Sequence, residues 1–334
     1  MPLAPKRLAG GGMGPRDKPG DDKRKRICQE HGCSGQGAAG QGIAMAEFLQ
    51  FVFSGVTVGS VYALVALGFT LIYNASDVVN FAQGEFVMIG GMVAVFALAA
   101  GLPLPLAGLV AVLAAVAVGL LLHRLAIEPA RGASPVTLII ITIGASIFLR
   151  GMAQIVFDKQ FHQLPAFSGT APIRVLGATI LPQSLWVIGG AAVIVAALWL
   201  FMERTLTGKA VRATAANRTA ARLVGIDVGR ILTLAFAVSA AIGAVAGLLV
   251  TPITLTSYDV GIALALKGFA AAMLGGMGNP LGAVLGGLLV GLLEAMTAGY
   301  LSSTYKDATA FLVILAVLFL MPRGLLGSRV VERV

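Results

Sequence analysis

Long apolar runs separated by short polar stretches cover most of the chain from Phe48 onward. A helix needs about 20 predominantly apolar residues to cross a bilayer. Clear runs of this kind lie at residues 48–73, 85–101, 106–122, 136–157, 184–202, 231–250, 281–298 and 308–321. A further run at 260–280 is interrupted by Lys267 and by glycines and a proline near its end. The pattern predicts an all-α, polytopic membrane bundle of about eight or nine transmembrane helices with broken or re-entrant segments.

Basic residues are distributed unequally between the polar stretches. Linker 123–135, loop 203–230 and the C-terminus together carry eleven Lys and Arg residues, whereas the opposing loops carry three. Because short loops rich in Lys and Arg stay in the cytoplasm, loop 203–230 is predicted to be cytoplasmic and loop 158–183 external. Only three clear runs follow residue 230, so the interrupted run 260–280 must also cross if the C-terminus is cytoplasmic. The same count of crossings places residue 48 on the external side of the membrane.

The composition narrows the possible functions. Hydrophobic residues make up 57% of the chain and charged residues 12%, and the mean hydropathy is +0.91. These values exclude a disordered protein, a disulfide-stapled secreted domain and an ordinary cytosolic enzyme. The net charge of +9 would point to nucleic acid in a soluble protein. Here the basic residues lie between apolar runs, so membrane topology explains them and no nucleic-acid partner is predicted.

Nothing in the sequence indicates catalysis or a metal. The two cysteines, Cys28 and Cys33, have only His31 beside them, whereas a zinc site needs three or four ligands. Phosphate-binding loops, H-E-x-x-H and G-x-S-x-G patterns are absent. The sequence therefore predicts no cofactor, no metal and no enzymatic activity of the chain itself.

Residues 1–44 differ in kind from the rest, since they are rich in Gly, Pro and basic residues. We expect either a basic disordered extension without function or a true start at Met45, which opens directly into the first apolar run. A start at Met45 also removes the conflict between a basic tail and an external residue 48. Residues 46–329 are expected to form the transmembrane domain.

The largest basic loop contains an amphipathic helix. Thr205 or Thr207 can cap its start, and Gly225 is well placed to end it. Alanines recur along it at three- and four-residue steps. Such a helix either docks on a protein or lies on lipid headgroups. Since it is rich in alanine and lacks large aromatic anchors, we expect a cytoplasmic helix that docks on a protein partner.

Two other stretches place polar residues at membrane depth. Segment 73–91 contains Asn74, Asp77, Asn80, Gln83 and Glu85, with Gly84 among them. Polar groups at that depth must face protein or water. The segment is either a solvated hairpin at the cytoplasmic surface or a broken segment that lines a translocation path.

Segment 265–294 is the second such stretch. Lys267 either extends to an interface or lies on the path, and Glu294 is either a buried carboxylate or interfacial. The GGMGNP stretch at 275–280 predicts a turn or a broken helix, since Pro280 has four glycines nearby, three of them within the stretch.

Four blocks in order resemble the branched-chain amino-acid ABC transporter permeases of the LivH type. They are GVTVGSVYALVALGFTLIYNASDVVNFAQGEFVMIGG at 55–91, GKAVRATAANRTAARLVGID at 208–227, KGFAAAMLGGMGNPLGAVLGGLLVGLLE at 267–294 and MPRGLLG at 321–327. The resemblance covers about residues 46–329, and only residues 1–44 depart from it.

The resemblance implies a subunit that forms the translocation path of an ATP-driven importer in the inner membrane. Its implied partners are a second related permease subunit, two cytoplasmic ATPase subunits, a periplasmic substrate-binding protein, the small-molecule substrate and membrane lipid. Residues expected to couple to the ATPase are Gly208, Arg212, Ala213, Ala220, Leu223 and Gly225. Residues expected on the translocation path are Asn80, Gln83, Glu85, Lys267 and Asn279.

Two alternatives remain open at this point. Urea and short-chain amide importers have closely similar permeases, and the pore residues do not separate leucine from urea. A self-sufficient channel or secondary transporter would instead use Glu85, Lys267 and Glu294 for ion coupling. Such a protein would transport without an ATPase.

Overall fold

The computed structural model describes residues 35–130, 132–169, 171–175, 177–321 and 324–327. The chain divides into two compact units, Met1–Glu47 and Phe48–Val334. The second unit contains most of the first helix and every later element. Of the predicted extension, residues 1–34 lie outside the described residues.

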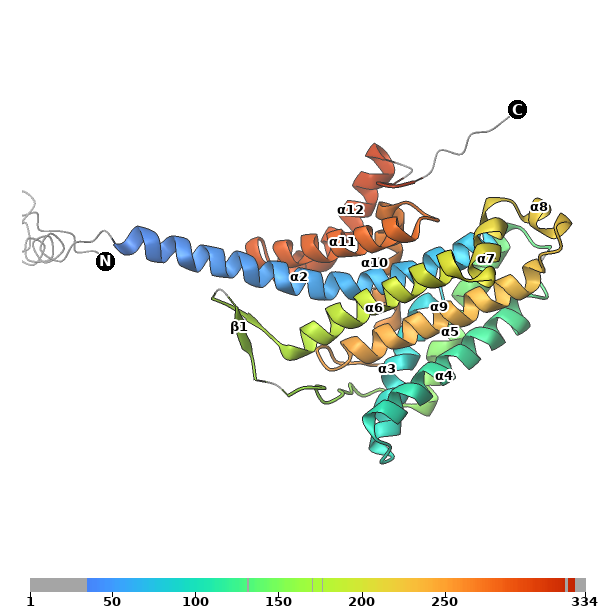
Figure 1. Ribbon diagram of the computed structural model, residues 1–334. Helices are drawn as coiled ribbons and strands as arrows, with labels where there is room; N and C mark the ends of the chain where they lie inside the picture. The colour runs from blue at the N-terminus through green and yellow to red at the C-terminus, as the bar shows by residue number, and fades with distance from the viewer. Residues whose placement is uncertain (1–34, 131, 170, 176, 322–323, 328–334) are drawn as a thin grey trace, which may run out of the picture. The chain divides into compact units, whose positions relative to one another are not determined.

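The described residues are almost entirely helical (Figure 1). The long helices are α2 (Gly35–Ser76), α3 (Gln83–Ala99), α4 (Leu104–Leu122), α5 (Pro135–Val156), α6 (Pro182–Arg204), α9 (Val228–Val250), α10 (Val260–Gly275), α11 (Pro280–Tyr300) and α12 (Lys306–Leu320). Two short helices, α7 (Leu206–Ala216) and α8 (Arg218–Leu223), lie between α6 and α9. A π-helical turn (His123–Ile127) extends α4, and a 3-10 turn (Ser303–Tyr305) precedes α12. One antiparallel hairpin joins β1 (Ile173–Val175) to β2 (Ala178–Ile180).

The prediction of an all-α, polytopic membrane bundle is confirmed. Among the described residues, six helices are long and apolar enough to cross a membrane, and α3 and α10 are shorter apolar helices. One boundary differs from the prediction: α2 begins at Gly35, so residues 35–44 are helical where a disordered extension was expected. These residues contain no proline and lead straight into an apolar run, so an established helix can propagate through them despite their glycines.

Contacts between distant loops define the two ends of the bundle. His162 and Thr256 pair through their backbones, which joins the α5–α6 loop to the α9–α10 loop at one end. At the other end, Arg212, Gly278 and Leu326 line one cavity. Helix α10 therefore returns the chain from the first end to the second, as the count of crossings predicts.

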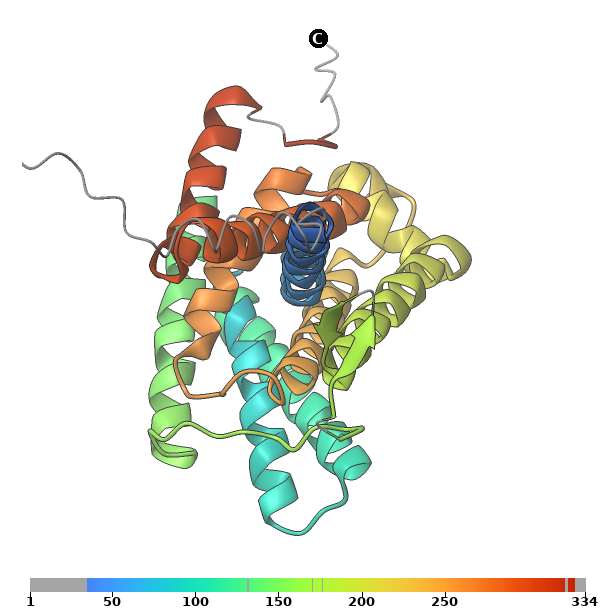
Figure 2. The same cartoon turned by 90° about the vertical axis from the view of Figure 1, so that its left-hand side faces the viewer.

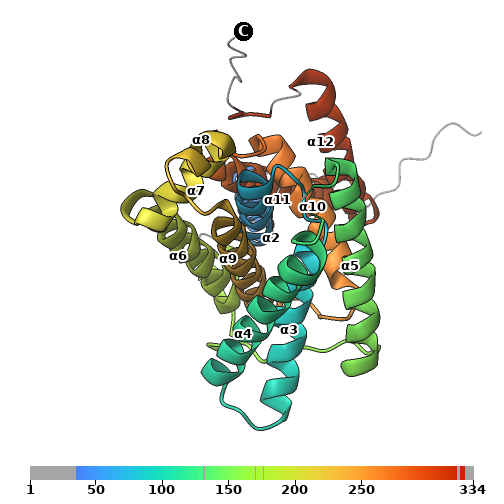
Figure 3. The ribbon, with the colours of Figure 1, turned by 90° about the vertical axis from the view of Figure 1, so that its right-hand side faces the viewer.

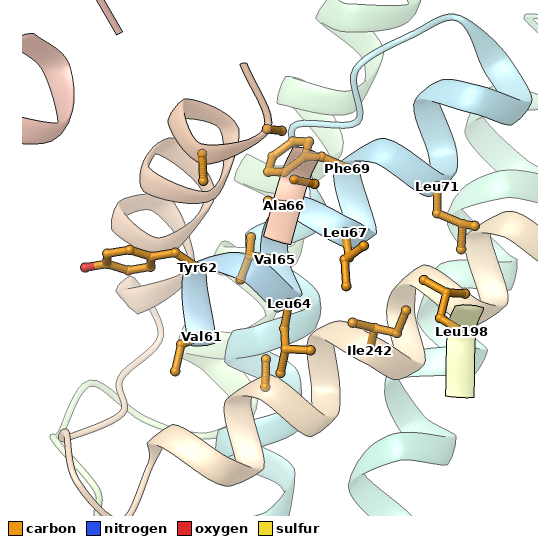
Figure 4. Close-up of a cluster of buried hydrophobic side chains, with 14 of the residues drawn as sticks. Val61, Tyr62, Leu64, Val65, Ala66, Leu67, Phe69, Leu71, Leu198 and Ile242 are labelled. Atoms are coloured by element: carbon orange, nitrogen blue, oxygen red, sulfur yellow. The ribbon is translucent and has the colours of Figure 1, made fainter. Parts of the chain in front are cut away.

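Helix α2 forms the centre of the unit that begins at Phe48. Figure 2 shows it nearly end-on, with α11 beside it. In its most apolar stretch 89% is buried, against 17% for α5 and 22% for α6. Close-up views show successive α2 side chains pointing in different directions: Leu64 and Leu67 lie near Ile242 of α9, whereas Tyr62 points away from it (Figure 4).

Glycines allow the central helices to approach closely. A Cβ atom added to Gly84 of α3 would lie 1.9 Å from the Gly261 carbonyl oxygen of α10. A Cβ added to Gly287 of α11 would lie 2.4 Å from the backbone of Ala63. Both distances are shorter than any real contact, so these crossings require glycine.

Candidate coupling surface and translocation path

The segment predicted to be cytoplasmic, 203–228, folds as two helices instead of the single helix predicted. The Thr205 hydroxyl caps α7 by accepting from Gly208 N at 2.9 Å, as expected. Gly225 has φ +84° and follows the end of α8, also as expected. The single-helix prediction is wrong at Asn217, whose backbone is extended and whose Oδ1 accepts from Ala220 N at 2.9 Å. Asparagine competes for backbone donors in this way, so it ends one helix and caps the next.

Two of the predicted coupling residues bind α7 firmly to the end of α6. A Cβ on Gly208 would lie 2.2 Å from the Phe201 carbonyl oxygen, so the backbones are in direct contact. Both terminal nitrogens of Arg212 bind the two carboxylate oxygens of Glu203. A bidentate pair of this kind fixes the orientation of both side chains.

The other predicted coupling residues lie on the exposed side of the same segment. Ala213 and Ala220 hydrogen bond to Asn217 through their backbones, and their side chains are exposed. Leu223 is 84% exposed. Leu206 is 86% exposed and was missed by the sequence reasoning, although its position at the start of a cytoplasmic helix was a usable signal. Figure 3 shows α7 and α8 together at one end of the bundle.

An ion pair joins this segment to the turn between α2 and α3. Arg218 Nη2 lies 2.9 Å from Asp77 Oδ2. Asp77 has φ +51°, an unusual conformation for a residue other than glycine. Sequence reasoning named Asp77 as a polar residue of the segment and did not name Arg218 as its partner.

The polar residues that follow Asp77 are buried within protein instead of solvated at the surface. Gln83 is fully buried; its Oε1 accepts from Ser239 Oγ of α9 at 2.6 Å. Glu85 is 1% exposed and accepts from Ser146 Oγ of α5 at 2.7 Å. Arg150 Nε lies 3.8 Å from the same Glu85 carboxylate. These side chains therefore link α3 to its neighbours.

Asn80 is also buried, at 1% exposure, and its Oδ1 accepts from Ala82 N at 3.1 Å. It lines a small cavity of about 10 Å³ next to Thr142. This space is about the size of a single water molecule and is too small for an amino acid.

Lys267 lies in a charged network that joins four helices. Its Nζ donates to Glu294 Oε1 of α11 at 2.7 Å and to Asp307 Oδ1 of α12 at 2.6 Å. The Tyr62 hydroxyl of α2 donates to Glu294 Oε2 at 2.8 Å, and Lys267 Nζ lies 5.5 Å from the centre of the Tyr62 ring. Side chains of Lys267 and Glu294 are each 10% exposed. Glu294 is thus a buried carboxylate, and Lys267 pairs within the protein. Sequence reasoning did not identify Tyr62 or Asp307.

Asn279 caps α11 and fastens a distant segment. Its Oδ1 accepts from Leu281 N and Gly282 N, and its Nδ2 donates to the Leu326 carbonyl oxygen at 3.0 Å. Asn279 also lines the larger of two cavities beside α2. Among the five residues expected on the translocation path it is the one placed on either of these two cavities; Asn80, Gln83, Glu85 and Lys267 line neither.

The larger cavity has a volume of about 750 Å³ and lies next to α7, where Arg212 and Glu203 contribute to its wall. The second cavity, of about 530 Å³, lies between α2, α6 and α11 and has an almost entirely apolar wall. Within the described residues no group of His, Cys, Asp and Glu side chains could hold a metal ion.

Together, a helical membrane bundle, two cavities beside its central helix and an exposed helix pair at one end define a membrane transport subunit. The family model described as "Branched-chain amino acid transport system / permease component" matches residues 51–321. The chain belongs to this family.

Known relatives agree with this assignment. The high-affinity branched-chain amino acid transport system permease protein LivH of Escherichia coli is 36% identical over 304 residues, which cover 86% of this chain and 98% of LivH. BraD of Pseudomonas aeruginosa, a permease protein of the same kind of system, is 35% identical over the same shares. The ribose import permease protein RbsC of Haemophilus influenzae is 28% identical over 78% of this chain and 81% of RbsC. The solved structure of PsaBC from Streptococcus pneumoniae gives a TM-score of 0.42 at 16% identity, covering 84% of this chain and 92% of that one.

Proposed function

We propose that this chain is a permease subunit of an ATP-driven importer of branched-chain amino acids in the inner membrane. Its partners are a second related permease subunit, two cytoplasmic ATPase subunits and a periplasmic substrate-binding protein. Support for the substrate comes from relatives such as LivH and BraD, which belong to branched-chain amino acid transport systems.

The observation that carries the ATPase partner is the exposed apolar side of α7 and α8. Leu206, Leu223 and Val224 are 86%, 84% and 76% exposed in a segment whose other side chains are mainly alanines and polar or charged residues. Large apolar side chains that are exposed outside the membrane-spanning helices indicate a protein contact. Gly208, Arg212, Ala213, Ala220 and Gly225 shape and hold this surface.

Movement of the ATPase would reach the bundle through two attachments. The Gly208 contact and the Arg212–Glu203 pair fasten α7 to α6. The Arg218–Asp77 pair fastens α8 to the α2–α3 turn. A displacement of α7 and α8 would therefore move α6 and the α2–α3 turn at the same time. Coupling between remote sites requires such a physical connection between the two sites.

Reconstitution of the complete complex in proteoliposomes tests this function. We expect the Leu206→Ser/Leu223→Ser double variant to fold normally, to lose ATPase subunits on purification and to lower ATP-dependent leucine uptake about tenfold or more. The matched control is Leu206→Met/Leu223→Met, which keeps the apolar surface and should behave as wild type.

Two outcomes would contradict the proposed mechanism, and a third would contradict the proposed substrate. Undiminished uptake by the serine variant would show that the surface binds no ATPase. Leucine uptake by this chain alone, driven by an ion gradient without ATP, would favour the channel or secondary-transporter alternative. Uptake of urea with no uptake of leucine would replace the substrate class and leave the ATP-driven mechanism intact.

A further inference from the structure

Arg150 is a charged residue inside a membrane-spanning helix, and its hydrogen-bond donors are unused. Its ion-pair partner is Glu85, whose Oε1 lies 3.8 Å from Arg150 Nε and already accepts from Ser146. That distance balances the charge but is too long for a hydrogen bond. Nε is buried without an acceptor, and nothing among the described residues accepts from the two terminal nitrogens either. The guanidinium is therefore neutralised but not satisfied as a donor.

The guanidinium also lies deep in the membrane. Arg150 is six residues from the end of α5 at Val156, which places its Cα about 9 Å inside a helix about 33 Å long. Side chains lean toward the start of their helix, and Arg150 approaches a carboxylate that Ser146, one turn earlier, also contacts. It thus points away from the nearer membrane surface. The side chain is 26% exposed at this depth, where lipid tails offer no acceptor.

The surface of α5 beside Arg150 carries small residues that this chain leaves uncovered. A Cβ atom added to Gly144 or Gly151 would meet nothing within 4 Å. These glycines lie on one side of the helix, because seven residues make nearly two turns, and Ile140 and Ile147 are exposed on the same side. Small residues at such a position allow a second helix to approach closely, whereas they gain nothing against lipid.

Comparison with α6 shows which feature sets α5 apart. Both helices are little buried, at 17% and 22%, and Figure 3 shows them on opposite sides of the bundle. Gly189 of α6 also meets open space. Helix α6 has no charged residue between Pro182 and Met202, however, so its outer side can face lipid without cost. The unsatisfied arginine, and not the glycines alone, indicates that α5 faces protein.

We propose that the side of α5 formed by Ile140, Gly144, Ile147, Arg150 and Gly151 contacts the second permease subunit, which places a carboxylate or carbonyl oxygen against the Arg150 donors. This inference rests on the proposed function and names the surface through which the two permeases join. An oxygen acceptor in the fork of the guanidinium supplies the hydrogen bonds that Glu85 does not.

The same surface argues that the partner is a different chain. Helix α5 contains no acidic residue, so a second copy packed through α5 offers no carboxylate from that helix. A two-fold axis beside α5 would also bring two arginines together in a medium of low dielectric constant. A related permease of different sequence avoids both problems.

Photo-crosslinking in the complete complex tests the surface directly. Ile147 of α5 and Val193 of α6 lie near the middle of their helices and are 57% and 68% exposed, so they form a matched pair. Each is replaced in turn by p-benzoylphenylalanine, and the complex is irradiated in native membranes. We expect position 147 to give at least tenfold more cross-link to the second permease than position 193.

A glycine pair tests close approach independently. Gly144→Leu adds a bulky side chain to the proposed contact, and we expect about tenfold less second permease to co-purify with this chain. Gly189→Leu makes the same change on α6 and should leave co-purification unchanged. Because both glycines face open space, each variant subunit should fold, and its own melting temperature checks this.

The role of Arg150 is separated from its pairing with Glu85 by a double variant. Glu85→Gln/Arg150→Gln removes both charges at once, so no buried charge is left alone. We expect this variant to co-purify about tenfold less second permease, since its donor fork is gone. Glu85→Gln alone keeps the fork and should retain the partner.

Four results would overturn the proposal. They are equal cross-linking from positions 147 and 193, cross-links from position 147 to lipid alone, cross-links from position 147 to another copy of this chain, and full retention of the second permease by Gly144→Leu and the double variant. Any of these in a complex that contains the second permease refutes the α5 surface and leaves the proposed function intact. An active wild-type complex without a second permease refutes that part of the proposed function instead.

Discussion

Two pairs of short helices distribute polar and apolar side chains in opposite ways. Helices α3 and α10 lie inside the bundle and bury Gln83, Glu85 and Lys267. Helices α7 and α8 lie at its end and expose Leu206 and Leu223. In each pair the unexpected side chains are the informative ones. Buried polar groups hold neighbouring helices together, whereas apolar groups exposed outside the membrane-spanning helices are available for contact with a partner protein.

Substitution of Lys267 is the most direct test of whether buried polar groups hold the helices together. We expect Lys267→Met to lower the free energy of unfolding by about 3–5 kcal/mol, because it leaves the buried Glu294 carboxylate without its cation. Lys306→Met, on an exposed residue at the start of α12, is the control and should change stability little. Denaturant unfolding of the purified subunit in detergent measures both. Equal stability of the two variants would show that the network does not hold the helices.

Packing of α3 is tested by a single methyl group. Gly84→Ala places a Cβ atom against the Gly261 carbonyl, and we expect a loss of about 1–3 kcal/mol. The same substitution at Gly151 of α5 meets open space and should be neutral or slightly stabilising. Thermal unfolding of the two variants side by side measures the difference. A neutral Gly84→Ala would contradict the close approach of α3 and α10.

The ion pair of α8 should matter little for stability. Arg218 and Asp77 are 32% and 67% exposed, so we expect Arg218→Gln and Asp77→Asn each to cost about 0–1 kcal/mol. The double variant should cost no more than the larger single effect, since one interaction is lost in all three. A loss of several kcal/mol would place this pair with the buried network instead of the coupling surface.

The smallest effect on stability is expected from a substitution in the α5–α6 loop. Backbone donation from Gln160 and the His162 side chain hold the pKa of Asp158 below its ordinary value of 3.8. A carboxyl with a lowered pKa stabilises the folded state above its unfolded pKa, and this contribution disappears as the pH falls through the lowered value, below about pH 4. Asp158→Asn tolerates the residue's φ of +74° and should remove this acid dependence. Melting temperatures of both proteins between neutral and acidic pH measure it, and parallel curves would contradict the prediction.

Spans and capping residues could be predicted from the sequence because both depend on local patterns. Apart from the start of α2, apolar runs marked the long helices to within a few residues, and Thr205, Gly225 and the family resemblance were identified correctly. The break at Asn217 was missed, although asparagine at a helix start is a recognisable signal.

Pairings between distant segments could not be predicted in the same way. Lys267 and Glu294 each stood out as charges in apolar runs, but their contact depends on how α10 and α11 pack. The second cavity depends on the space left between α2, α6 and α11, which no single segment encodes. Assignment of Asn80, Gln83 and Glu85 to the path followed their polarity and stays a prediction, whereas their burial against neighbouring helices depends on tertiary packing that polarity does not reveal.

The segment after α12 hydrogen bonds to the turn between α10 and α11, which lies much earlier in the chain. Leu325 N and Leu326 N donate to the carbonyl oxygens of Leu274 and Gly275, and Asn279 reaches Leu326 across 47 positions of sequence. During synthesis, the end of α10 therefore leaves the ribosome with unpaired carbonyl groups that must wait for residues 325 and 326. Leu326 and Gly327 also line the larger cavity, so its wall is among the last parts of the subunit to be completed.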